Sequence, residues 1–208
     1  MAAVDRAGDI LAERHDAALR VLAAASSGGL PAILAGLREA TKAVPQVRRV
    51  ASWVVVRAAA DGSAAVATAL GVGRVWVAER TACVVCTAYA GLVAADGGEF
   101  PAGLTFGVRP ADRSPVPDPP RHPRCRCRTV PWSDAWAAPD VLPYPRALRR
   151  EAERSIAKGF ALDSEPTSVR VAAAERLLRS GPDLPASVRA FAARAVRDGI
   201  FPPVPAGI

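Results

Sequence analysis

The chain has 208 residues, half of them hydrophobic, which is enough to bury a substantial core in one large domain or two small ones. Its formal net charge of +7 is compatible with an anionic partner such as nucleic acid, although an Ala- and Arg-rich composition accounts for the charge equally well. Asp5, Arg6 and Asp9 argue against an export signal, and Arg57 interrupts the short apolar stretch 50–60, so we expect a cytoplasmic site of synthesis and no membrane span.

Residues 1–46 are predicted to form an N-terminal helical region. Apolar side chains recur at helical spacing from Val4 to Ala25, and the run of serine and glycine at 26–29 ends that helix. Pro31 suits the first turn of a second helix, which Pro45 is expected to end. Two interpretations of these amphipathic helices stay open, a docking surface for a large partner or a simple helical bundle.

Residues 47–131 are predicted to form a small β module that begins with a further helix. This helix is expected to cover 47–60, to bend at Asp61 and Gly62, and to resume as far as Leu70. The β-branched and aromatic residues from 72 to 80, Trp76 among them, then predict a strand. A second, shorter strand is expected at 89–93.

A long loop follows within the same module. Residues 94–123 carry glycine and proline throughout, so they can form neither a central strand nor a long helix. Loops of this length are uncommon in a compact domain unless they are functional or fixed at their ends. Because cysteines stand close to both ends of this loop, a bound metal would hold both ends in place.

The rest of the chain is predicted to be a linker and a basic helical region. Prolines punctuate the linker, 132–145, and helices are expected at 146–160, 166–179 and 185–198 within the C-terminal region 146–208. Arginines of this region are candidates for contact with nucleic acid or an acidic protein, although a solvated helix face is the simpler interpretation. The candidates are Arg146, Arg149, Arg150, Arg154, Arg189, Arg194 and Arg197. The fold class that follows is α+β, with mainly helical N- and C-terminal regions around a small β module.

The four cysteines and one of the two histidines form a pattern typical of a metal site. Cys83 and Cys86 are a Cys-x-x-Cys pair, and Cys125 and Cys127 follow His122 closely. Zinc prefers four such ligands in a tetrahedron, so five candidates compete for four places. We favour Cys83, Cys86, His122 and Cys125, with Cys127 as the substitute for His122, and expect a structural zinc ion. Four arginines, at 121, 124, 126 and 128, are expected to keep the pKa values of the thiols low.

Other uses of these cysteines fit the sequence less well. A thioredoxin-like redox pair needs a flanking βαβ pattern, and structural disulfides are disfavoured where thiols stay reduced. A zinc deaminase would need His-x-Glu and Pro-Cys-x-x-Cys motifs, which the sequence lacks. A site closed by four protein ligands leaves no position for a catalytic water. We therefore expect no enzymatic activity and no small-molecule substrate.

One known family shares this arrangement of residues. Trp76, the pair Cys83 and Cys86, the Ala-Gly-Leu-Val turn at 90–93, a Pro-rich loop and the closing His-Pro-Arg-Cys-Arg-Cys at 122–127 together resemble the phage Mu F-like family of minor head proteins. The resemblance covers residues 48–131. It implies a low-copy protein of the virion head interior that associates with the portal protein inside the procapsid, acts in head assembly, and in some members takes part in DNA packaging or delivery.

A second hypothesis comes from a different class. The same cysteine pattern is compatible with a zinc protein that binds nucleic acid, phage DNA included, or with an effector enzyme, a nuclease or toxin, built around a zinc module.

Overall fold

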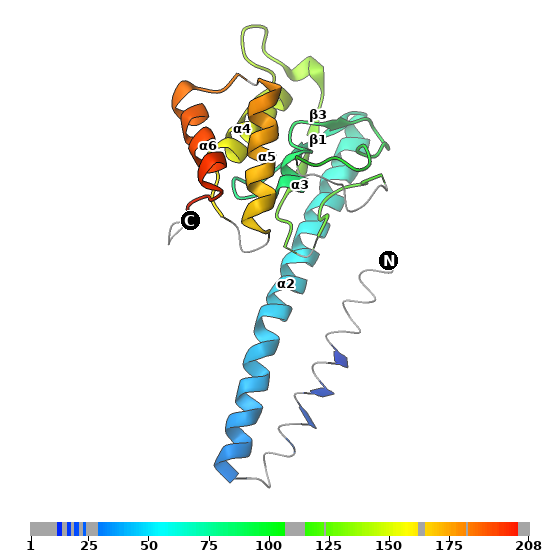
Figure 1. Cartoon of the computed structure of the whole chain (residues 1–208). Coiled ribbons are helices and arrows are strands. Elements are labelled where there is room, and N and C mark those ends of the chain that lie inside the picture. The colour runs from blue at the N-terminus through cyan, green and yellow to red at the C-terminus, as the bar shows by residue number, and fades with distance from the viewer. Residues whose placement is uncertain are drawn as a thin grey trace. The chain divides into compact units, whose positions relative to one another are not determined.

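The structure, a computed structural model, describes residues 12–13, 16–17, 19–20, 23, 29–106, 115–122, 124–161, 165–181 and 183–203. Most of the predicted N-terminal helix, Val4 to Ala25, therefore lies outside the described residues. The chain divides into two compact units, Met1–Val54 and Val55–Ile208. The described residues form helices and one small antiparallel sheet, so the predicted α+β class is confirmed (Figure 1).

The first described element is one long helix, α2, from Gly29 to Leu70, and it corrects the predicted ends and bend. The helix runs through Pro45, where we expected it to end, because a proline removes only one backbone donor and strong helix formers surround it. It also runs through Gly62, where a bend was predicted. There Arg57 forms an ion pair at 2.9 Å with Asp61, one turn further along, which supports the helical conformation.

Much of α2 exposes apolar side chains. Leu30, Ile33 and Leu37 are each about half exposed or more, and so are Val54 and Val55 further along the helix. The part from Val47 to Leu70 is, by length and composition alone, sufficient to cross a membrane, a property that core helices of soluble proteins also have. The predicted absence of a membrane span therefore stays a prediction.

The sheet has three strands in the order β2-β1-β3. The central strand β1, Gly73–Val77, lies within the strand predicted at 72–80, and both of its neighbours are antiparallel to it. The strand predicted at 89–93 is corrected: β2 is Val93–Ala94, because the chain first makes a turn in which the backbone N–H of Leu92 donates to the carbonyl of Tyr89 at 2.9 Å. The strand β3, Arg128–Trp132, was not predicted. It contains Pro131 and lies at the edge of the sheet, which is where a strand tolerates a residue without a backbone donor.

Two hydrophobic cores lie within the second unit. In the first, the ring of Trp76 packs against Tyr89 and Phe100, at centroid distances of 5.0 and 5.2 Å, and the buried cysteines border these rings. The second core joins the three C-terminal helices, and Val84 of the one-turn helix α3, Val84–Thr87, packs into it. The β module and the C-terminal helices therefore share one compact unit.

The C-terminal helices lie close to their predicted positions. They are α4, Tyr144–Ala157, α5, Thr167–Ser180, and α6, Ala186–Asp198. The last two end at Gly181 and Gly199, whose positive φ angles of 66° and 71° suit a helix C-cap. The predicted linker is not featureless, because it contains the 3-10 helix η1, Asp134–Trp136, and Trp132 packs against the rings of Trp136 and Tyr144.

Candidate metal centre

The first pair of cysteines lies on a tight turn between the sheet and the helices. Cys83 precedes the single helical turn α3, and its carbonyl oxygen accepts hydrogen bonds from the backbone N–H of Thr87 at 2.9 Å and from the Thr87 hydroxyl at 2.8 Å. These bonds bring Cys86 round to the same side as Cys83. The Cys86 side chain is buried, whereas Cys83 is only partly buried.

The second group of ligands lies between the loop and strand β3. The backbone N–H of Cys125 donates to the carbonyl of His122 at 2.8 Å, which keeps these two residues close together. Cys125 and Cys127 are both 2 % exposed, and Arg128 then pairs with Val77 of β1 at the start of β3. The sheet therefore fixes the position of this second group of ligands.

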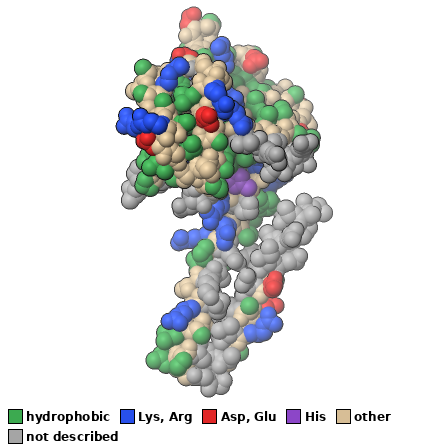
Figure 2. All heavy atoms as spheres, viewed as in Figure 1, with side chains coloured by type: hydrophobic (Ala, Val, Ile, Leu, Met, Phe, Trp, Pro, Cys, Tyr) green, Lys and Arg blue, Asp and Glu red, His purple; other side chains and the backbone are tan. Residues whose placement is uncertain are grey.

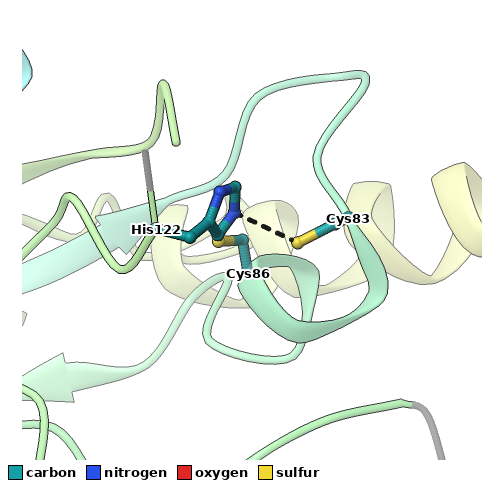
Figure 3. Close-up of side chains that lie close together, drawn as sticks. All are labelled: Cys83, Cys86 and His122. Atoms are coloured by element: carbon teal, nitrogen blue, oxygen red, sulfur yellow. Dashed lines mark hydrogen bonds between the residues drawn. The ribbon is translucent and has the colours of Figure 1, made fainter. Parts of the chain in front are cut away.

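All five predicted ligand residues come together. The Nε2 atom of His122 lies 3.3 Å from the sulfur of Cys83 and 3.2 Å from that of Cys86 (Figure 3). The sulfurs of Cys86 and Cys125 are 3.7 Å apart. Two groups of three ligand atoms, each within 4.8 Å of one another, share Cys86: one adds Cys83 and His122, and the other adds Cys125 and Cys127.

These distances suit a small cation with tetrahedral coordination. Bonds of about 2.3 Å from zinc to sulfur give sulfur–sulfur edges of about 3.8 Å, and the shorter bond to nitrogen gives sulfur–nitrogen edges of about 3.6 Å. The observed sulfur–sulfur distance of 3.7 Å agrees, and the observed sulfur–nitrogen distances of 3.2 and 3.3 Å are slightly shorter. The cluster can therefore hold a metal ion. His122 and Cys127, one in each group, are the two candidates for the fourth ligand.

The close approach of the thiols separates their pKa values. The pKa of Cys83 is lowered to about 4, chiefly because the Cys86 thiol donates a hydrogen bond to it, and the pKa of Cys125 is lowered to about 2 by hydrogen bonds from Cys127 and Cys86. The donor thiols are harder to ionise, so the pKa of Cys86 is raised, and that of Cys127 is raised to about 12. The pKa of His122 is raised, chiefly by its hydrogen bond with Cys83.

We expected the four neighbouring arginines to lower the pKa values of the thiols, but they are not the main cause. Hydrogen bonds among the side chains of the cluster, and not arginine charges, are the largest cause of the lowered thiol pKa values. Two of these arginines are engaged elsewhere: Arg126 donates to the Thr81 hydroxyl at 2.8 Å, and Arg128 lies 3.6 Å from the carboxylate of Glu79. A third, Arg121, lies over the ring of Tyr89.

A buried ion pair, which we did not predict, fixes the loop that carries His122. Arg74 of β1 donates to Asp118 at 3.1 Å and to the carbonyl of Gly98 at 2.9 Å, and the Thr129 hydroxyl donates to the same carboxylate oxygen at 3.1 Å. Burial raises the pKa of Asp118, and Arg74 opposes that rise. An acidic residue among prolines, 44 positions from its arginine, gives no sequence signal of such a pair.

Four of the seven arginines proposed as partner contacts form ion pairs with acidic residues of this chain. Within the described part of the chain, Arg149 pairs with Glu153 and also donates to the carbonyl of Ala88 at 2.9 Å. Arg154 pairs with Glu151 and Arg197 with Asp198 on the same helix, and Arg150 pairs with Asp183, which lies between α5 and α6. On the face shown in Figure 2, basic side chains lie in separate groups with acidic ones among them. A role in nucleic-acid binding stays a prediction.

Three comparisons with known proteins bear on identity. No protein-family model matches the sequence, no curated protein matches it, and no solved structure matches its fold.

Proposed function

We propose that the cluster binds a structural zinc ion. Several features support zinc over harder cations: four of the five candidate ligands are sulfur, the fifth is imidazole, and such soft and borderline ligands favour zinc over magnesium or calcium. Cys83 and Cys86 fill two of the four positions of a tetrahedral site. His122, Cys125 and Cys127 are three candidates for the other two positions. Protein side chains alone therefore complete the coordination shell, which is typical of structural sites and leaves no place for a reacting water.

The proposed role of the ion is to hold the ends of the long loop together. The sulfur of Cys83 and the imidazole of His122 are 39 positions apart in sequence, yet they lie 3.3 Å apart. The sheet has only three short strands, so few ladder hydrogen bonds hold this part of the chain. Structural zinc sites contribute on the order of 10 kcal/mol, which is comparable to the whole stability of a small domain.

We infer that the protein is a structural minor head protein of a tailed phage or prophage. One observation carries this proposal: three sequence features meet at one site. They are the strand with the buried Trp76, the pair Cys83-x-x-Cys86, and the segment His122-Pro-Arg-Cys125-Arg-Cys127. That combination resembles the phage Mu F-like family. The protein would act in the head interior, in association with the portal protein and the procapsid, without enzymatic activity.

Two measurements test the two parts of this proposal. Elemental analysis of the purified chain should find one zinc ion per chain, and Cys83→Ser should lower both the zinc content and the melting temperature. If both quantities are unchanged in that variant, the structural role of the ion is wrong.

The phage assignment needs an assay of its own. When the chain is expressed from a complete prophage, it should sediment with procapsids that contain the portal protein and be absent from the supernatant. Binding of the isolated chain to DNA, with an affinity that falls steeply as salt rises, would instead favour the nucleic-acid-binding alternative. A chain found wholly outside the capsid fractions would contradict the assignment.

A further inference from the structure

A second buried ion pair lies beside the metal centre, and it involves residues outside the cysteine motif. Arg170 of α5 is 1 % exposed, and its Nε atom donates to the carboxylate of Glu165 at 2.8 Å. The two side chains are 2 % and 7 % exposed. A buried ion pair is not by itself evidence of stability, because removing two charges from water offsets much of their attraction. The role of this ion pair therefore follows from the other groups that Arg170 and Glu165 contact.

Those contacts reach the two peptide groups on either side of Cys83. A terminal nitrogen of Arg170 donates to the carbonyl of Ala82 at 2.9 Å. The second carboxylate oxygen of Glu165 accepts from the backbone N–H of Val84 at 3.0 Å. The pair therefore holds the residue before Cys83 through its carbonyl and the residue after it through its amide.

Neighbouring groups hold the guanidinium of Arg170 in this position. Its other terminal nitrogen donates to the carbonyl of Ser155 in α4 at 3.3 Å. A Cβ atom at Gly159 would collide with that nitrogen, so a side chain there would displace the guanidinium. Three separate segments, α4, α5 and the turn that carries Cys83, thus meet at one side chain.

Cys83 is the cysteine that most needs such support. The other three cysteines are at most 2 % exposed and are held by packing in the core, whereas Cys83 is only partly buried. A ligand that packing does not fix depends on its backbone for orientation, and residues that orient metal ligands commonly change metal affinity about 10- to 100-fold when they are replaced.

We propose that Arg170 and Glu165 are positioning residues of the metal centre, which orient the thiolate of Cys83 through its two flanking peptide groups. This inference rests on the proposed metal site. It makes the C-terminal helices part of the support for that site, so that metal affinity depends on residues about 80 positions beyond the ligand they orient.

The test measures zinc affinity by competition with a chromophoric chelator, using the full chain. Glu165→Gln should weaken zinc binding about 10- to 100-fold, because an amide cannot accept from both Arg170 and Val84 as the carboxylate does. The matched controls are Glu175→Gln and Arg179→Gln, an exposed ion pair on the same helix, which should leave the affinity unchanged.

A second variant and a second measurement guard against a folding defect. The double change Arg170→Met with Glu165→Gln removes the buried charges and keeps the volume, so the helices should remain folded by circular dichroism while zinc affinity falls at least as far. Cobalt in place of zinc should show a weaker and shifted sulfur-to-metal absorption band in both variants. Unchanged affinity and an unchanged band in variants that retain their helices would overturn the positioning role alone. A wild-type chain that binds no zinc or cobalt would overturn the metal site as well.

Discussion

Replacement of Cys86 by serine is the sharpest test of the metal centre, because both groups of candidate ligands contain this residue. Its sulfur lies 3.2 Å from Nε2 of His122 and 3.7 Å from the sulfur of Cys125. A change at Cys86 therefore disrupts the site whichever residue is the fourth ligand. Serine has nearly the same shape, so the change removes the thiolate without opening a large cavity.

The size of the effect follows from the binding equilibrium. At free zinc of 1,000 times the dissociation constant, an ion that binds only the folded chain adds about 4 kcal/mol of stability. For a unit as long as Val55–Ile208, each kcal/mol changes the melting temperature by about 2–4 °C. We therefore expect Cys86→Ser to melt about 8–16 °C below the wild type when zinc is in excess.

Thermal melts followed by circular dichroism check this expectation, with the chelated proteins as the control. In excess chelator, the melting temperature of the wild type should fall close to that of Cys86→Ser, because the bound ion is the source of the difference. Two results would refute the reasoning: a wild-type melting temperature that does not respond to zinc, or a Cys86→Ser variant that responds to zinc as strongly as the wild type.

Three further predictions concern the ligands and the loop. Only one of the variants His122→Ala and Cys127→Ser should lose most of its zinc affinity, and elemental analysis after dialysis identifies which one. Full retention of zinc in both variants would contradict a four-ligand site. Zinc binding at neutral pH should release at least one proton, because the Cys86 thiol has a raised pKa and must ionise whichever residue is the fourth ligand. The zinc affinity should therefore rise with pH. Calorimetry in buffers of different ionisation enthalpy counts the protons, and a count near zero would contradict coordination by Cys86. Asp118→Ala should destabilise the chain by about 3–5 kcal/mol in urea unfolding, because it leaves the buried charge of Arg74 without a carboxylate to balance it. A loss below about 1 kcal/mol would mean that the ion pair contributes little to stability.

The sequence was most informative where chemistry depends on residue type. All five ligand candidates could be identified because cysteine occurs nowhere else in the chain, and the structure brings them together. The last two C-terminal helices were predictable for a similar reason, since Gly181 and Gly199 mark their ends. These signals are local, and each needs only a few neighbouring residues to be recognised.

Features that depend on distant residues could not be predicted in the same way. Strand β3 contains Pro131, which argues against a strand unless its place at the edge of the sheet is known. The continuity of α2 through Pro45 depends on the helix-forming residues on both sides of it. The partners of the buried Arg170 include a carbonyl 88 positions away, so only the folded chain shows that this arginine is not a surface charge.

The bonds made by Arg74 also have a consequence for protein engineering. This side chain donates to carbonyls on both sides of the loop, at Gly98 and at Pro117, and a backbone bridge between Phe100 and Val116 lies just beyond them. Together these contacts join residues 98–100 to residues 116–118, next to the place where the proposed ion would link Cys83 and His122. Arg74 is therefore a position to leave unchanged in any redesign of this module, because its replacement would remove the bonds to both sides of the loop at once.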